Sequence, residues 1–138
     1  MKRLLLALTI ATASFVAFTS CTKEYYDTVL AKTMIYEKTA TRYPWQGTDN
    51  AAYFTLPVPE LTSYYINQGI VSVAISPDNE TTYQTIPATI NGVAYSYDYK
   101  AGSITIYAED PIMEDGSLIE VPDNLVIKVS LIDADYVE

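Results

Sequence analysis

The chain contains no histidine among its 138 residues, and it has a single cysteine, Cys21. Histidine is the commonest general base and the commonest metal ligand, so its absence excludes histidine-dependent catalytic triads and histidine-based metal centres. One cysteine cannot form a disulfide within the chain. The fold must therefore be held together by its hydrophobic core.

Long apolar runs are also lacking, except for the fifteen residues from Leu4 to Phe18. As a helix this run would be about 22 Å long, shorter than the roughly 30 Å hydrocarbon core of a bilayer. Lys2 and Arg3 precede the run, and the small residues Thr19 and Ser20 follow it. A charged start, a short apolar core and a small-residue end are typical of a secretory signal peptide, here residues 1–20.

The end of this signal, Phe18-Thr19-Ser20-Cys21, resembles the lipobox of bacterial lipoproteins, although leucine is commoner than phenylalanine at its first position. The resemblance implies cleavage before Cys21, a diacylglyceryl group on its sulfur and, usually, a third acyl chain on the new amine. Several acyl chains hold a protein firmly on a membrane. A plain cleaved signal is the alternative, but it leaves the lone cysteine at the cleavage site unexplained. We expect no cofactor beyond this covalent lipid.

Residues 21–32 are predicted to be the lipidated cysteine and a tether, and residues 33–138 a single domain. Lys23-Glu24, with Asp27 nearby, partly resembles the signal that sends lipoproteins of the Bacteroidetes to the cell surface; an ordinary polar linker is the alternative. We therefore expect a lipid-anchored protein of the outer membrane that faces the cell surface rather than the periplasm.

Basic residues are scarce, with eight Lys and Arg against 17 Asp and Glu. Lys2 and Arg3 belong to the predicted signal, so the mature chain would carry a net charge of −11. Nucleic acids and anionic headgroups both require a basic surface, so the composition argues against either as a partner.

The 13 tyrosines and the many β-branched residues favour strands. We predict an antiparallel β-sandwich of about seven strands, immunoglobulin-like in outline, with one short helix and a signal-peptide helix before it. Hydrophobic alternation predicts strands over 33–38, 53–58, 70–76, 83–90, 93–100, 103–108 and 125–132, a loop over 41–50 and a helix over 59–68.

Asn91-Gly92, between two β-rich runs, predicts a two-residue type I′ hairpin turn, and Ala101-Gly102 predicts a second tight turn. Both turns place the alternating tyrosines of the middle strand on the core face rather than on a carbohydrate platform. The predicted pairs are Ile90 with Val93, Ala88 with Tyr95, Ile86 with Tyr97, Tyr99 with Ile104, Tyr97 with Ile106 and Tyr95 with Ala108.

Four other aromatic residues, Tyr43, Trp45, Tyr53 and Tyr107, are candidates for a ligand-stacking surface. Tyr107 lies on the face opposite the predicted core. For Trp45 the favoured alternative is that the ring caps a small core.

Six carboxylates between Glu109 and Asp123 suggest a Ca²⁺ site, with Asp110, Glu114 and Asp115 as candidate ligands. Their spacing does not match an EF-hand, and acid-rich loops are usually only solvated. We therefore expect no metal.

Five segments from the middle of the chain onward are similar to a group of small lipoproteins of gut and oral Bacteroidetes. The resemblance implies a lipid anchor and a β-sandwich, but it brings no catalytic or ligand-binding residues. The segments are VPEL (58–61), NQGIVSVAI (67–75), QTIPATI (84–90), YSYDYKAGSITIY (95–107) and NLVIKVSLIDADY (124–136).

The favoured hypothesis is a non-enzymatic interaction or structural module at the outer membrane. Alternatives are a glycan-binding accessory protein of a polysaccharide-utilisation system and a fimbrial or adhesin subunit, because a sandwich edge can accept a donated strand. A glycosidase that uses only carboxylates is a further alternative. We disfavour it because so small a sandwich leaves little room for a deep cleft.

Overall fold

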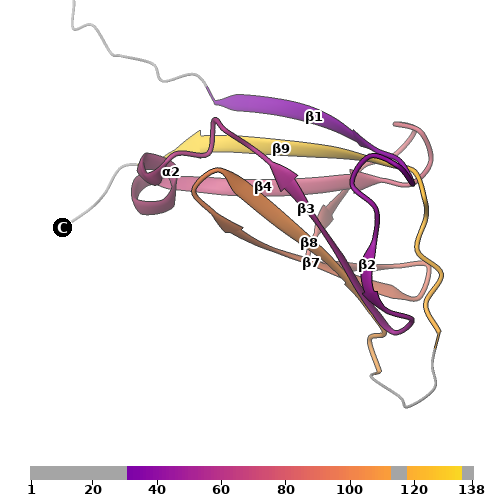
Figure 1. The fold of residues 1–138 in the computed structure, drawn as a ribbon. Helices are drawn as coiled ribbons and strands as arrows, with labels where there is room; N and C mark the ends of the chain where they lie inside the picture. The colour runs from indigo at the N-terminus through magenta and orange to yellow at the C-terminus, as the bar shows by residue number, and fades with distance from the viewer. Residues whose placement is uncertain (1–30, 113–117, 135–138) are drawn as a thin grey trace, which may run out of the picture.

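A computed structural model describes residues 31–112 and 118–134, and it is an antiparallel β-sandwich of two sheets (Figure 1). The predicted signal peptide with its helix, and nearly all of the predicted tether, lie outside the described residues. The four-stranded sheet has the order β1-β9-β4-β5, and the five-stranded sheet has the order β2-β3-β8-β7-β6. The strands are β1 (Lys32–Lys38), β2 (Gln46–Thr48), β3 (Ala51–Pro57), β4 (Gly69–Ser76), β5 (Gln84–Ile86), β6 (Ala88–Ile90), β7 (Val93–Lys100), β8 (Ser103–Glu109) and β9 (Leu125–Asp133).

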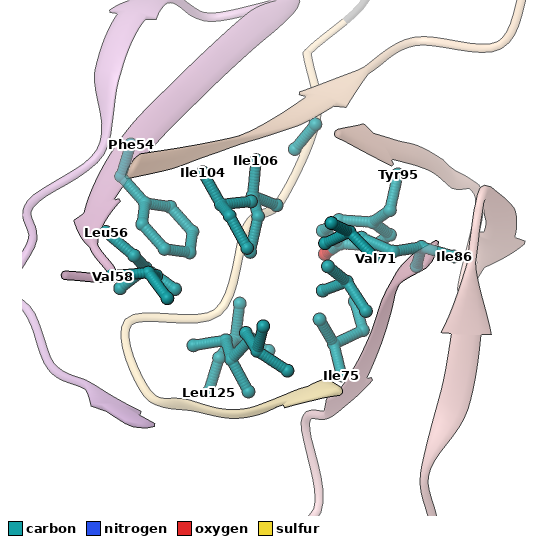
Figure 2. Packing of buried hydrophobic residues seen from close by; sticks show 14 of the residues in the cluster. Phe54, Leu56, Val58, Val71, Ile75, Ile86, Tyr95, Ile104, Ile106 and Leu125 are labelled. Carbon is teal, nitrogen blue, oxygen red and sulfur yellow. The ribbon is translucent and has the colours of Figure 1, made fainter. Parts of the chain in front are cut away.

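The two sheets pack through side chains that alternate along each strand, as the sequence predicts. Phe54, Leu56 and Ile106 of the five-stranded sheet face Ile75 and Leu125 of the other sheet (Figure 2). Burying an aliphatic side chain of this size stabilises a fold by about 1.5–3 kcal/mol. Further buried members of this core are Val58, Leu61, Val71, Val73, Ile104, Ala108, Ile127, Val129 and Leu131.

The described residues form nine strands rather than about seven, partly because the predicted loop over 41–50 contains β2. This short strand forms a hairpin with β3, in which Gly47 pairs with Ala52. Gly47 has a φ of 113°, and a Cβ at this position would collide with the Ala51 carbonyl oxygen. The absence of a side chain therefore lets the hairpin close.

Pro87 accounts for the other additional strand, and it makes one predicted pair wrong. Ile86 does not pair with Tyr97; it pairs with Val73 of β4, in the opposite sheet. Proline has no backbone N–H to donate, so a ladder cannot continue through Pro87. The chain crosses here from β5 in one sheet to β6 in the other, and the Ile86–Pro87 peptide bond is cis.

The other predicted hairpin pairs are confirmed. Asn91 and Gly92 have φ values of 50° and 82°, the two left-handed conformations that a type I′ turn requires. The tyrosines of β7 follow a gradient, because Tyr95 is buried, Tyr97 is half-buried and Tyr99 is 42% exposed. The core position predicted for Tyr99 is therefore wrong. In the described residues β6 pairs with β7 only as far as Tyr95, which leaves the flank of Tyr99 open.

The helix α2 (Ser63–Gln68) is shorter than predicted and begins four residues later. Residues 58–62 instead form a turn against the β7–β8 hairpin, where the Val58 N–H donates to the Gly102 carbonyl and the Gly102 N–H donates to the Leu61 carbonyl. These bonds hold the buried Leu61 in a tight turn rather than a helix. Within residues 31–112 and 118–134, no helix is long and apolar enough to cross a membrane.

A side-chain hydrogen bond joins strands of the two sheets directly. The Tyr97 hydroxyl of β7 donates to the Val71 carbonyl oxygen of β4 at 2.7 Å. Tyr99, two residues along, stacks on Tyr97 with ring centroids 6.2 Å apart, but its ring lies at the surface. Removing the hydroxyl of each tyrosine in turn therefore distinguishes the loss of this hydrogen bond from the loss of a hydroxyl at the surface.

We expect Tyr97→Phe to lower the free energy of unfolding by about 1 kcal/mol, because it removes this hydrogen bond and leaves the Val71 carbonyl without the hydroxyl. Tyr99→Phe is the matched control and should change the stability by less than about 0.5 kcal/mol. Urea unfolding followed by circular dichroism measures both values. Equal effects of the two variants would show that the bond between the sheets contributes nothing.

Candidate functional site

The outward face of the five-stranded sheet carries aromatic and polar side chains, and we call it the tyrosine face. Its side chains alternate with the buried ones, so the register that builds the core also builds this face. Two rows cross the strands. The first is Gln46-Tyr53-Tyr107-Ser96, and the second is Thr55-Thr105-Asp98.

Tyr53 and Tyr107 form the centre of this face. They lie directly opposite each other on β3 and β8, with ring centroids 6.2 Å apart and ring planes tilted by 41°. Tyr53 is 38% exposed, and Tyr107 is partly exposed beside it. Because both rings stand on paired strands, their spacing is set by the backbone rather than by a loop.

Polar groups surround this ring pair. In the next row the hydroxyls of Thr55 and Thr105 are 3.1 Å apart. Desolvation, followed by the nearby Asp98 carboxylate, raises the pKa of Tyr107, so its hydroxyl stays protonated at neutral pH. A shallow hollow of about 210 Å³ lies between Asp98, Thr105 and Tyr107.

This arrangement offers both apolar and hydrogen-bonding contact on one exposed, rigid surface. The ring faces of tyrosine can stack on the C–H face of a flat ligand, while hydroxyls and a carboxylate bind polar groups at its edges. The hollow is open and shallow, so a ligand here would lie on the surface rather than inside a cleft. Sugars have this combination of an apolar face and a polar edge.

The other two aromatic candidates lie away from the tyrosine face. Trp45 packs edge-on against Phe54, with ring centroids 4.7 Å apart, and its Nε1–H donates to the Pro122 carbonyl oxygen at 2.9 Å. It caps the core, the alternative that the sequence favoured. Tyr43 packs against the same core, and the Arg42 guanidinium lies 5.5 Å from its ring centroid. Neither ring contributes to a common stacking surface with Tyr53 and Tyr107.

Lys38, which is only 1% exposed, was not predicted as a buried residue. Its Nζ lies 4.9 Å from the ring centroid of Trp45 and 5.5 Å from that of Phe54, and it donates to the Asp123 carbonyl oxygen at 3.0 Å. Burial lowers the pKa of Lys38, and Asp123 partly offsets this effect. The available signal was the alternation of β1, which places Lys38 on the same inward face as Met34.

Of the three candidate calcium ligands, Asp110 alone lies in the described residues. Asp110 is 7% exposed, and its Oδ1 accepts a hydrogen bond from the Ile112 N–H at 3.0 Å. Glu114 and Asp115 lie outside the described residues. In the part of the chain that the structure describes, no three acidic or cysteine side chains come close enough together to hold a metal ion.

Comparison with known proteins identifies no relative of this chain: no family model matches it, and no curated protein or solved structure is significantly similar to it. Its function must therefore be inferred from the chemistry of its surfaces.

We expect Lys38→Met to change how stability depends on pH. Burial lowers the pKa of Lys38 below its usual value of 10.5, so the unfolded chain holds this proton over a pH range in which the folded chain has lost it. The contribution of Lys38 to the free energy of unfolding therefore rises with pH up to 10.5 and is constant above that pH. The wild-type protein should gain stability relative to Lys38→Met between pH 7 and 10.5, measured by urea unfolding at each pH. A difference independent of pH would contradict the prediction.

Proposed function

We propose that this chain is an outer-membrane lipoprotein, anchored through acyl chains on Cys21, whose sandwich is a non-enzymatic binding module at the cell surface. The lipobox resemblance at 18–21 supports the anchor, and the Lys23-Glu24 pair supports surface exposure. The absence of histidine and the shallow hollow on the tyrosine face support binding rather than catalysis.

The best-supported ligand class is a neutral glycan, and the Tyr53–Tyr107 pair is the observation that carries this proposal. The exposed ring of Tyr53 and the partly exposed ring of Tyr107 lie side by side within rows of hydroxyl, amide and carboxylate groups. The net charge of −11 expected for the mature chain would repel glycans rich in uronic acid or sulfate. A rigid sheet face loses little conformational entropy on binding, so even a few contacts can hold an extended sugar chain.

The anchor is tested with Cys21→Ser in the full-length protein, expressed in a bacterium with a lipoprotein-processing pathway. The wild-type protein should fractionate with the outer membrane and carry acyl chains by mass spectrometry. Cys21→Ser cannot accept the diacylglyceryl group, so it should lose the acyl mass and leave the outer-membrane fraction. A free Cys21 thiol in the membrane-bound wild-type protein would contradict the anchor.

Glycan binding is tested with an array of neutral polysaccharides and then by titration of the best ligand. We expect Tyr53→Ala and Tyr107→Ala each to weaken binding by about tenfold, since a stacked ring contributes on the order of 1.4 kcal/mol. Tyr64→Ala is the matched control, because Tyr64 is 46% exposed but lies on α2, outside the tyrosine face. Unchanged affinity in both tyrosine-face variants, or an array without any bound glycan, would contradict the proposal.

A further inference from the structure

Three exposed isoleucines lie at one end of the sandwich, and we call them the isoleucine patch. Ile70 of β4 is 54% exposed, and Ile132 of β9 and Ile66 of α2 are each 38% exposed. Ile70 and Ile132 are direct cross-strand partners, and Ile66 lies on α2, which directly precedes β4 in the chain. Tyr64 of the same helix is also exposed, and the polar side chains of Ser63, Asn67 and Gln68 lie exposed beside these apolar ones.

The patch lies where the chain arrives from the predicted lipid anchor. Lys32, the first residue of β1, pairs with Leu131, so residue 31 lies beside Ile132. The start of β1, the end of β9 and α2 all lie at the same end of the sandwich (Figure 1). The isoleucine patch and the attachment point of the tether therefore share one end.

A polar boundary limits the patch on the outward face of the four-stranded sheet. The next row across the strands is Ser72-Ser130-Thr33, and the Thr33 and Ser130 hydroxyls are 3.2 Å apart. Lys32, at the start of β1, is exposed at the same end. An apolar end followed by hydroxyls and a lysine matches the change from acyl chains to headgroups at a membrane surface.

We propose that the isoleucine patch docks on the lipid surface to which Cys21 is anchored, so that the domain lies against the membrane in a fixed orientation. This inference rests on the lipid anchor proposed above. The eleven residue steps from Cys21 to Lys32 span at most about 40 Å, so the patch always remains near the bilayer. At such a distance a tether of this kind provides an effective concentration in the millimolar range. Shallow insertion of a few isoleucines is then sufficient.

The orientation is tested on the lipidated full-length mature protein in phosphatidylcholine vesicles. Cys21 is acylated in this protein, so a second cysteine can be spin-labelled selectively. Ile70→Cys places the label in the patch. Glu37→Cys is the matched control, because Glu37 lies on the same sheet face at the opposite end of β1, where it pairs with Val126. Electron paramagnetic resonance then measures the accessibility of each label to oxygen, which concentrates in lipid, and to a water-soluble nickel complex.

We expect the oxygen-to-nickel accessibility ratio at position 70 to exceed that at position 37 by severalfold in vesicles, and the difference to vanish in a soluble Cys21→Ser protein. Equal ratios at the two positions in vesicles would overturn the proposal, since the domain would then rotate freely on its tether. A label at position 70 shielded from both reagents, with or without vesicles, would also overturn it. In that case another part of the chain or a second copy would cover the patch.

A triple variant separates docking from anchoring. The lipidated Ile66→Ser/Ile70→Ser/Ile132→Ser protein should still sediment with the vesicles through its acyl chains, while trypsin cuts its tether several times faster than in the wild type. Ile35→Ser is the control, because Ile35 is 56% exposed on β1 outside the patch and should leave the cleavage rate unchanged. Unchanged cleavage in the triple variant refutes docking alone. A wild-type protein that does not sediment refutes the anchor, and docking with it.

Discussion

The packing of the two inner sheet faces against each other is the constraint on which the rest of this structure depends. No disulfide supports the fold, so the alternation that buries Phe54 and Ile106 must keep its register across β3 and β8. A strand has only two faces, and the same register therefore presents Tyr53 and Tyr107 to solvent. The core and the tyrosine face are consequences of a single pairing. A slip of one residue would destroy both.

Local chemistry predicted much of the fold. The Asn91-Gly92 turn fixed the register between β6 and β7, and hydrophobic alternation identified the inward face of β9. The errors arose where a distant partner decides the local structure. Ile86 pairs with β4 rather than with β7. Val58 and Leu61 bond to Gly102, so residues 59–62 form a turn instead of beginning a helix. Neither partner can be identified from the residues nearby in the chain.

The candidate site was only half predictable for the same reason. The sequence proposed Tyr53 and Tyr107 separately, but their adjacency depends on the pairing of β3 with β8, which are far apart in the chain. The contact between Lys38 and Trp45 could not be predicted from the sequence either. A lysine at the end of a strand ordinarily extends into water. Here two aromatic rings and a backbone carbonyl compensate for the lost hydration.

The Lys38–Trp45 cluster has a consequence for how this protein can vary. The Lys38 and Trp45 side chains donate to the backbone carbonyls of Asp123 and Pro122, at one end of the acidic segment from Glu109 to Asp123. At its other end the Asp110 N–H donates to the Asn50 carbonyl oxygen. The segment is thus fastened at its two ends by groups whose bonds do not depend on the side chains between them. Ile119 and Val121 of this segment also pack against the core, and the Ile119 N–H donates to the Asp49 carbonyl oxygen. These two positions can therefore vary only among apolar residues of similar size if the sandwich beneath is to stay the same.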